Sequence, residues 1–477
     1  MRELPSSPYI AGAWAVGDGE LFDVLNPATG EVLATVAGAG ERDLESALAA
    51  ASDALPTWSR TAPRVRGEVL RRAFELMHER AEELATLMTL EMGKTLADAR
   101  AEVGYAAEFF RWFAEEAPRI GGELRTAPSG GNRILTLRKP VGVCLLVTPW
   151  NFPAAMATRK IGPALAAGCT VVLKPAEDTP LTALYLAGLL AEAGAPPGVV
   201  NVLPTAQPGP LVAAALADER FRKLSFTGST AVGRLLLAQA APRVLRCSME
   251  LGGNAPFIVL EDADLDAAVD GAMLAKMRNG GQACTAANRF LVRAEVAEEF
   301  TAKLTDRMAA LRLGPGSDET TGLGPMVNRR AVERITKLVD DAVAGGAKIH
   351  LGATPTAGPG FFYPATVLTE ASQASTLATE EVFGPVAAIY PVASDEEVVA
   401  RANATEYGLT GYLYTRDLAR GLRIGEQLEI GMIGLNRGLV SDPAAPFGGV
   451  RQSGLGREGG FEGIEEYLET SYIATSW

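Results

Sequence analysis

Five short runs of strand-forming residues, separated by helical stretches, occupy the middle of this 477-residue chain. They cover residues 141–147, 170–173, 199–203, 223–226 and 246–249. Strands that alternate with helices of this length predict a parallel sheet with helices on both of its faces. Such a sheet binds its ligands at the carboxyl ends of its strands, so the residues that follow each strand are the first candidates for a functional site.

Polar or glycine-rich turns follow four of these strands. The turns are Pro149-Trp150-Asn151-Phe152-Pro153, Lys174-Pro175-Ala176-Glu177, Thr227-Gly228-Ser229 and Glu250-Leu251-Gly252-Gly253. No GxGxxG fingerprint of a dinucleotide-binding turn is present in the sequence. Gly228 and Ser229 nevertheless lie between a strand and a helix, where the backbone N–H groups of a helix N-terminus can point at a phosphate.

The rest of the chain extends this pattern. Apolar residues at three- and four-residue steps predict two or three helices between residues 41 and 117. Residues 121–139 alternate apolar and polar side chains about a Pro-Ser-Gly-Gly turn, which predicts a two-stranded excursion. Alternating strands and helices resume at residue 257, and a polar and aromatic strand is expected at 467–472. The predicted fold class is α/β, with two doubly wound domains and a small β excursion.

The composition argues against several classes of function. A net charge of −13 argues against a nucleic-acid partner and an anionic membrane surface, and no apolar run approaches the ~18 residues of a membrane helix. The first residues lack the pattern of a signal peptide, and the four cysteines are widely spaced without a CxxC pair. A reducing compartment, and so a cytoplasmic protein, is expected. With two histidines, neither a metal site nor a histidine-based nucleophilic site is expected.

Two glycine-rich segments hold a carboxylate and a thiol. Glu250 begins Glu250-Leu251-Gly252-Gly253-Asn254, and Cys284 ends Gly280-Gly281-Gln282-Ala283-Cys284. Glycine leaves the backbone approachable and permits tight turns, so both groups can lie at a narrow cleft. A thiol that forms a covalent adduct and a carboxylate that deprotonates water suffice for acyl-enzyme chemistry. Taken alone, however, a cysteine is more often an inert buried side chain.

Seven blocks, spread in order over roughly 300 residues, resemble those of the NAD(P)-dependent aldehyde dehydrogenases. They are Pro149-Trp150-Asn151-Phe152-Pro153, Lys174-Pro175-Ala176-Glu177, Phe226-Thr227-Gly228-Ser229-Thr230, Glu250-Leu251-Gly252-Gly253, Gly281-Gln282-Ala283-Cys284, Glu381-Val382-Phe383-Gly384-Pro385 and Pro446-Phe447-Gly448-Gly449. Within this superfamily the chain is most similar to the succinate-semialdehyde dehydrogenases. That similarity is carried by Thr158-Arg159-Lys160, Arg278-Asn279, Leu439-Val440-Ser441 and Ser453-Gly454-Leu455-Gly456-Arg457-Glu458-Gly459.

The resemblance implies four catalytic residues. Cys284 would attack the aldehyde to form a thiohemiacetal, which becomes a thioester when hydride leaves for the nicotinamide. The side-chain amide of Asn151 and the backbone N–H of Cys284 would stabilise the oxyanion, and losing one such donor typically lowers the rate by ~10²–10³. Glu250 would activate the water that hydrolyses the thioester, and Lys160 would shuttle or stabilise charge near Glu250.

The resemblance also implies a nicotinamide dinucleotide as cofactor. According to this resemblance, different blocks would hold the adenosine ribose, the pyrophosphate, the nicotinamide ribose and the nicotinamide ring. The implied residues are Lys174 and Glu177 for the adenosine ribose, Gly228 and Ser229 for the pyrophosphate, Trp150 and Leu251 beside the cofactor, Glu381 for the nicotinamide ribose and Phe383 against the ring. A carboxylate at Glu177 can accept a hydrogen bond from the ribose 2′-hydroxyl and repel a 2′-phosphate, so NAD is expected and NADP is possible.

The implied substrate is a small aldehyde with a distal carboxylate. Arg159, Arg278 and Ser441 occupy the matching positions, and an arginine fork suits a carboxylate. The alternative is that each arginine pairs with a structural carboxylate of the chain itself. Glutarate semialdehyde is a second possible substrate, a non-catalytic NAD-binding protein is a different possible class, and Glu250 argues against a CoA-acylating enzyme. Position 286 is alanine, so the cysteine that can form a redox-switch disulfide in succinate-semialdehyde dehydrogenases is absent.

The resemblance further implies a division of the chain and a homodimer or homotetramer. The NAD(P)-binding domain would comprise residues 1–120 and 140–249, and the catalytic domain residues 250–440. Residues 121–139 and 458–477 would be the oligomerisation segments.

Overall fold

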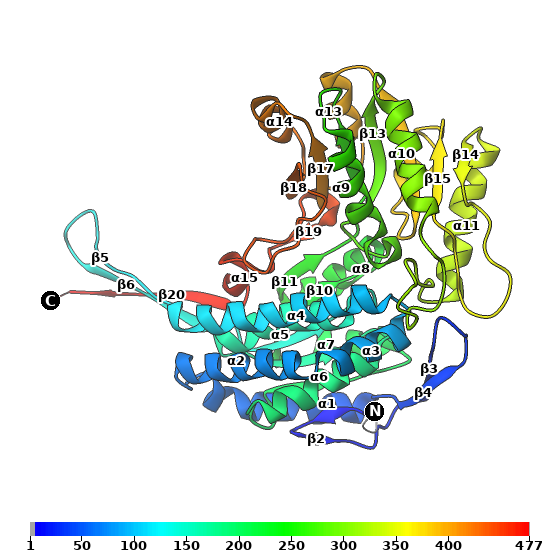
Figure 1. The fold of residues 1–477 in the computed structure, drawn as a ribbon. Helices are drawn as coiled ribbons and strands as arrows, with labels where there is room; N and C mark the ends of the chain where they lie inside the picture. Colours follow the sequence, from blue (N-terminus) through cyan, green and yellow to red (C-terminus); the bar gives the residue numbers. More distant parts are fainter. Residues whose placement is uncertain (1–4, 477) are drawn as a thin grey trace.

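The computed structural model describes residues 5–476, and Figure 1 shows two large sheets covered by helices. The strands of the first sheet are Tyr9–Ile10 (β1), Ala13–Trp14 (β2), Val143–Val147 (β7), Thr170–Lys174 (β8), Val200–Val202 (β9), Phe221–Thr227 (β10), Arg246–Glu250 (β11) and Gly454–Leu455 (β19). Their order is β19-β11-β10-β7-β8-β9-β1-β2. The five central strands, which the sequence predicts, pair in parallel, and the short edge strands pair antiparallel.

Helices cover both faces of this sheet because its central strands are apolar on both sides. Its helices are Glu41–Trp58 (α1), Pro63–Glu79 (α2), Ala81–Met92 (α3), Leu96–Glu116 (α4), Pro153–Ala167 (α5), Pro180–Glu192 (α6), Pro208–Ala217 (α7) and Thr230–Ala240 (α8). Leu146 and Leu173 pack into one apolar cluster with α2, α4, α5 and α6. Leu145 and Val172 point the other way and pack with α1, α7 and α8.

The predicted number of helices between residues 41 and 117 is wrong, because four helices, α1 to α4, lie there. Helices α2 and α3 are separated by Arg80 alone, whose backbone leaves the helical region (φ −117°, ψ 26°). The apolar periodicity therefore runs on across the break. Pro63 begins α2, a position that proline favours, and Gly93 ends α3 in the left-handed conformation (φ +92°).

The second sheet is also doubly wound. Its strands are Ala255–Val259 (β12), Ala287–Arg293 (β13), Lys348–Leu351 (β14), Thr366–Thr369 (β15), Val386–Val392 (β16), Thr410–Tyr414 (β17) and Met432–Leu435 (β18). Its helices are Leu265–Met277 (α9), Ala297–Ala309 (α10), Arg329–Ala344 (α11), Thr376–Thr379 (α12), Asp395–Asn403 (α13) and Leu418–Gly425 (α14). The order is β14-β15-β16-β13-β12-β17-β18, parallel except at β14. The predicted fold class is confirmed. Within residues 5–476, no helix combines the length and the apolarity that a membrane crossing requires.

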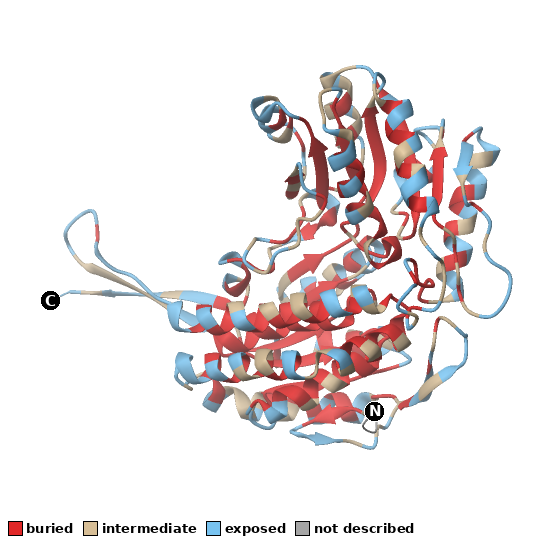
Figure 2. Cartoon of the chain, viewed as in Figure 1, coloured by how far each residue is buried: buried red, intermediate tan, exposed pale blue. Residues whose placement is uncertain are grey.

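A slender arm projects from the first sheet. Its three antiparallel strands are Leu124–Thr126 (β5), Arg133–Pro140 (β6) and Leu468–Thr475 (β20). Figure 1 shows the arm extending away from the body, and Figure 2 shows that its residues are mostly exposed or half-buried. A separate two-stranded ribbon, Leu21–Leu25 (β3) and Val32–Ala37 (β4), lies near the N-terminus.

After β18 the chain returns to the first sheet. Phe447 bridges Glu458, and β19 pairs with β11 so that Gly454 lies opposite Glu250. A short helix, Glu462–Glu465 (α15), then leads into the arm. The predicted domain boundaries stay predictions. The predicted C-terminal oligomerisation segment begins at Glu458, which is buried beside the first sheet and lies outside the strands of the arm.

Candidate active site

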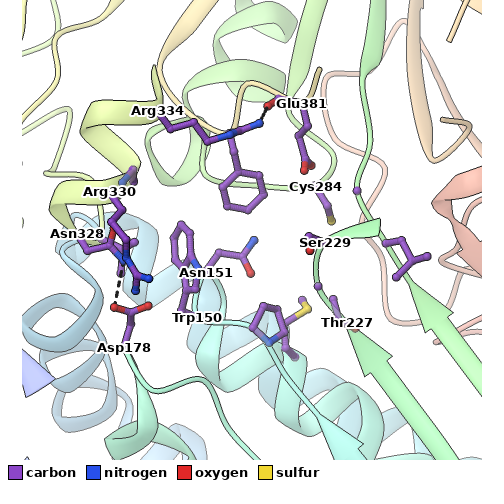
Figure 3. Close-up of a pocket in the computed structure, with 18 of the residues that line it drawn as sticks. Trp150, Asn151, Asp178, Thr227, Ser229, Cys284, Asn328, Arg330, Arg334 and Glu381 are labelled. Atoms are coloured by element: carbon purple, nitrogen blue, oxygen red, sulfur yellow. Dashed lines mark hydrogen bonds between the residues drawn. The ribbon is translucent and has the colours of Figure 1, made fainter. Parts of the chain in front are cut away.

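A cavity of about 480 Å³ lies where the carboxyl ends of β7 and β10 face helix α11 (Figure 3). Ligand sites of parallel sheets occur at this edge. Nine of the predicted site residues line it: Trp150, Asn151, Glu177, Gly228, Ser229, Leu251, Cys284, Glu381 and Phe383. The other six, Arg159, Lys160, Lys174, Glu250, Arg278 and Ser441, are not part of this lining.

The loop that carries Cys284 depends on its glycines. Asn279 and the two glycines after it adopt left-handed backbone conformations, with φ of 54°, 61° and 74°. A Cβ on Gly281 would lie 2.2 Å from the carbonyl oxygen of Gly384, and a Cβ on Gly253 would lie 2.6 Å from that of Cys284. Only glycine permits these close approaches, so the glycine-rich pattern determines where the thiol lies.

Asn151 lies in the turn between β7 and α5, and Figure 3 shows its amide directed toward the same space as the Cys284 thiol. Its Nδ2 donates to the carbonyl oxygen of Gln282 at 3.0 Å. A side-chain amide has two N–H hydrogens, so one of them is still available to a ligand. Its Oδ1 is buried without a hydrogen-bond partner among the described residues.

The Cys284 side chain is half-buried. Burial raises the pKa of Cys284 to about 12, and the positive charges of Arg159 and Arg278 act in the opposite direction. At neutral pH the thiol is therefore protonated in this state. A reactive thiolate requires an additional favourable field when ligands bind.

Glu250 ends strand β11 and is buried. Neither of its carboxylate oxygens has a hydrogen-bond partner among residues 5–476. Burial, and next the negative charge of Glu458, raise the pKa of Glu250 well above its usual range, against the opposing effect of Arg159 and Lys160. A buried carboxylate without partners is costly to a fold, which favours a chemical role for Glu250.

Lys160 lies beside Glu250 but is paired with another carboxylate. Its Nζ donates to Glu458 Oε1 at 2.5 Å and to Ser225 Oγ at 2.9 Å. Arg159 makes a second ion pair with Glu458 through its Nε. Although burial acts in the other direction, Arg159 and Lys160 hold the pKa of Glu458 below its usual value. Glu458 therefore stays charged between two buried cations.

One part of the cavity is formed by the turn after β8 and the N-terminus of α8. Lys174 Nζ is buried and lies 3.6 Å from Glu177 Oε2. Ser229 caps α8 and accepts a hydrogen bond from the N–H of Val232 at 3.4 Å. A helix N-terminus presents unpaired N–H groups and a positive partial charge, which suit a pyrophosphate.

Glu381 and an aromatic pair also line the cavity. Glu381 Oε1 accepts a hydrogen bond from the N–H of Gly253 at 3.2 Å, and burial raises the pKa of Glu381 to about 7. The rings of Trp150 and Phe383 are 5.3 Å apart in an edge-to-face arrangement. Phe383 has a left-handed backbone (φ +54°), an unusual conformation for a bulky residue that often marks a functional position. These groups fit a nicotinamide dinucleotide.

The two arginines predicted to hold a carboxylate lie in different surroundings. Arg159 is 1% exposed and paired with Glu458, and its guanidinium lies 4.2 Å from the ring centroid of Phe447. Its Nη1 has no hydrogen-bond partner among the described residues. Arg278 is half-buried against the ring of Phe152, at 4.7 Å. Within residues 5–476 no ion pair involves Arg278. Ser441 is half-buried.

The sequence of residues 14–473 matches the family described as the aldehyde dehydrogenase family. The chain belongs to this family. It is 56% identical to a succinate-semialdehyde dehydrogenase of Paenarthrobacter nicotinovorans, over 93% of this chain and 98% of that protein. It is 47% identical to a glutarate-semialdehyde dehydrogenase of Pseudomonas aeruginosa, over 98% and 96%. The crystal structure of a succinate-semialdehyde dehydrogenase from Burkholderia pseudomallei superposes with a TM-score of 0.98 at 46% identity, over the full length of both chains.

Membership of the aldehyde dehydrogenase family confirms the predicted resemblance and identifies the chain as an NAD(P)-dependent oxidoreductase. The structure of this aldehyde dehydrogenase also shows residues that the sequence analysis did not single out. Glu458 lies in one of the matching blocks without a role implied for it, and its burial depends on the return of the chain tail to β11. Tyr105, on α4, has a buried hydroxyl that faces Arg159 and Ser441, and its ring centroid lies 5.9 Å from the guanidinium carbon of Arg278. Arg334 donates to the backbone carbonyl of Glu381 (Figure 3). No sequence motif marks Tyr105 or Arg334.

Proposed function

We propose that this aldehyde dehydrogenase oxidises succinate semialdehyde to succinate, with NAD as cofactor. The Cys284 sulfur, as thiolate, forms a bond to the aldehyde carbon, and the carbonyl electron pair moves to the oxygen. Asn151 donates a hydrogen bond to that oxyanion. After oxidation to the thioester, Glu250 takes a proton from water, the hydroxide adds to the acyl carbon, and the carbon–sulfur bond breaks to release succinate and the Cys284 thiolate.

The residues around the cavity would hold the dinucleotide along its length. Lys174 and Glu177 would hold its adenosine ribose, Ser229 and the N-terminus of α8 its pyrophosphate, and Glu381 and Phe383 its nicotinamide end. When bound, the dinucleotide supplies the hydride acceptor for the oxidation. NAD is preferred over NADP because Glu177 would repel a 2′-phosphate.

The observation that supports a carboxylate-bearing substrate is Arg278. It lies six residues before Cys284, and its charge acts on the pKa of that thiol. Its cation contacts aromatic rings and has no carboxylate partner among the described residues. A half-buried guanidinium without a counter-charge is poised to accept an anionic ligand. Ser441 and the hydroxyl of Tyr105 would add polar contacts to the same carboxylate.

The second candidate substrate is glutarate semialdehyde, which has the same two end groups and one more methylene. The 47% identity to a glutarate-semialdehyde dehydrogenase favours it. One methylene usually changes specificity by roughly 10- to 200-fold, so the two aldehydes can be distinguished kinetically.

The test is a measurement of kcat/KM for succinate semialdehyde, glutarate semialdehyde and butyraldehyde, each with NAD and with NADP. We expect succinate semialdehyde with NAD to be the best pair. Equal or faster turnover of butyraldehyde would refute a carboxylate-specific enzyme, and no turnover of any aldehyde would favour a non-catalytic NAD-binding protein. Alkylation of Cys284 by iodoacetamide with and without NAD distinguishes that last case, because only a catalytic thiol should respond to the cofactor.

We further propose a cytoplasmic homodimer or homotetramer. All four cysteines are free thiols, which suits a reducing compartment. The arm formed by β5, β6 and β20 exposes Leu124, Tyr472 and Ile473 to 60%, 62% and 47%. Apolar side chains on a projecting sheet are typical of surfaces that a second copy covers. Sedimentation of the intact chain and of a chain with Tyr472→Ser and Ile473→Ser would test this assembly.

A further inference from the structure

A buried ion pair outside the cavity lies directly behind the Asn151 turn. Lys94 follows the end of α3, and Glu102 is in α4. Both side chains are fully inaccessible to solvent, and Lys94 Nζ is in contact with Glu102 Oε2. A buried pair of this kind is weak evidence for stability, because removing two charges from water offsets most of their attraction. Its retention in the interior therefore calls for another explanation.

Each member of the pair also contacts the turn between β7 and α5. Lys94 Nζ donates to the backbone carbonyl oxygen of Asn151 at 2.8 Å. Glu102 Oε1 accepts from the backbone N–H groups of Ala154 and Ala155, at 2.9 and 3.2 Å, in the first turn of α5. These N–H groups have no partner within the helix. The pair thus binds the turn at Asn151 and again at the start of the helix that follows.

The same carbonyl oxygen of Asn151 is bound from the other side by the Cys284 loop. Asn279 Nδ2 donates to it at 2.8 Å and to the carbonyl oxygen of Gln282 at 3.0 Å. The Asn151 amide itself donates to that second oxygen. The Asn151 carbonyl is therefore a shared acceptor for Lys94 and for the loop that carries the nucleophile. Two donors on one carbonyl restrict the rotation of that peptide plane.

The ring of Phe152 lies beside the same lysine. Lys94 Nζ is 4.2 Å from the ring centroid, and the guanidinium of Arg278 is 4.7 Å from it. Contacts of this length are attractive cation–π contacts. The ring therefore links the buried lysine to the arginine that we assign to the substrate carboxylate.

We propose that Lys94 and Glu102 are positioning residues for acylation at Cys284. They hold the Asn151 peptide so that its side-chain amide meets the oxyanion, and this inference rests on the role of Asn151 in the proposed function. The pair touches neither substrate nor cofactor and acts through the turn. Catalytic donors must be held within a fraction of an ångström, and a displacement of about 1 Å can cost roughly 100-fold in rate.

The test distinguishes the effect of the hydrogen bond that Lys94 donates to Asn151 from the effect of the negative charge of Glu102. Removing Lys94 alone would leave Glu102 as a buried carboxylate without its counter-charge and endanger folding, so both charges are removed together in Lys94→Met with Glu102→Gln. The matched control is Glu102→Gln alone. Burial lowers the pKa of Lys94 and Glu102 opposes that effect, so without the carboxylate Lys94 can lose its proton; the neutral amine still donates to Asn151, and the amide oxygen of the new side chain can still accept from Ala154 and Ala155. If methionine is not accommodated, Lys94→Gln with Glu102→Gln gives the same comparison, because the two amides can pair with each other.

The measured quantity is the rate constant of the first NADH burst with succinate semialdehyde and NAD, per folded protein. We expect the double variant to acylate roughly 10- to 100-fold more slowly than the Glu102→Gln control, with KM for NAD unchanged. Lys223→Met serves as a second control, since Lys223 is equally buried but contacts Ser248 and Glu466, away from Asn151. It should lower the melting temperature without lowering the burst rate.

A cycle with Asn151→Ala distinguishes positioning from general loosening of the fold. If Lys94 acts through Asn151, the loss of Lys94 has no further effect on the burst rate once the amide is gone. An equal fold-loss in both backgrounds, or a burst rate in the double variant equal to that of Glu102→Gln, would overturn the inference. If Asn151→Ala itself acylates at the wild-type rate, the role of Asn151 in the proposed function is refuted. That result differs from a refutation of the role of Lys94, in which Asn151→Ala is slow and the double variant is not.

Discussion

Arg278→Met should remove most of the preference for a carboxylate-bearing aldehyde while leaving the site intact. Methionine keeps an unbranched apolar stem against the ring of Phe152, so the packing of that ring changes little. A hydrogen bond to a charged group contributes about 1.5–3 kcal/mol, which corresponds to roughly 10- to 150-fold in kcat/KM. We expect a loss of this size for succinate semialdehyde and a change of less than about threefold for butyraldehyde, which has the same number of carbons and no carboxylate.

Arg159→Met is the informative comparison, because the structure gives the two arginines different partners. Arg159 is fully buried and paired with Glu458, so its removal leaves that carboxylate with Lys160 alone. Breaking a buried ion pair typically costs about 3–5 kcal/mol of stability. We expect Arg159→Met to lower the free energy of unfolding by that order and to slow both aldehydes, since Glu458 also acts on Glu250.

The assays are steady-state kinetics with both aldehydes and denaturant unfolding of each variant. The reasoning is refuted if Arg278→Met slows succinate semialdehyde and butyraldehyde by the same factor, because Arg278 would then be a structural residue. It is equally refuted if Arg159→Met is as stable as the wild type and selectively loses succinate semialdehyde.

Four further predictions concern the reaction and the cofactor. Cys284→Ala should abolish oxidation while NAD still binds, measured by quenching of tryptophan fluorescence; residual turnover near wild type would exclude Cys284 as nucleophile. Glu250→Gln should slow deacylation by ~10²–10⁴ and leave the NADH burst, and because the pKa of Glu250 is raised, the wild-type deacylation rate should rise with pH through a midpoint above the usual carboxylate range. Glu458→Gln removes a negative charge that raises that pKa, so the midpoint should move to lower pH; a pH profile that does not move contradicts this coupling. Glu177→Ser should improve kcat/KM for NADP relative to NAD by at least roughly fivefold, since two like charges a few ångströms apart repel by about 1–4 kcal/mol; an unchanged ratio would show that Glu177 does not select the cofactor.

The sequence was most informative where the physical constraint is local. Apolar runs separated by helical stretches predicted the five parallel strands of the first sheet, because strands buried on both faces must be apolar throughout. Glycine at positions 253 and 281 indicates close backbone approach, and the structure gives the cause, since a Cβ at these positions would lie 2.6 and 2.2 Å from a backbone carbonyl oxygen. The break between α2 and α3 was missed because a single non-helical residue leaves the apolar periodicity unchanged.

The sequence was least informative where a contact joins residues far apart in the chain. Lys160 and Glu458 are 298 positions apart, and only the return of the tail to β11 brings them together. No periodicity or spacing encodes such a meeting. The two arginines are a second example. The sequence assigns both to the substrate carboxylate from their matching positions, but it does not reveal that Glu458 of the tail forms an ion pair with Arg159 and not with Arg278.

The tail contact also explains how Glu250 can be both buried and useful as a base. A carboxylate without hydrogen bonds in an apolar interior would simply stay protonated, and a direct ion pair with Lys160 would make it too weak a base to deprotonate water. Glu458 avoids both outcomes: it takes the ion pairs of Arg159 and Lys160 and leaves Glu250 beside two cations that it does not bind. The positive charges still lower the pKa of Glu250, while the charge of Glu458 and burial raise it. The basicity of Glu250 is thus set by a residue of the C-terminal tail, so substitutions that undock the tail should alter the pH dependence of deacylation before they alter the binding of NAD.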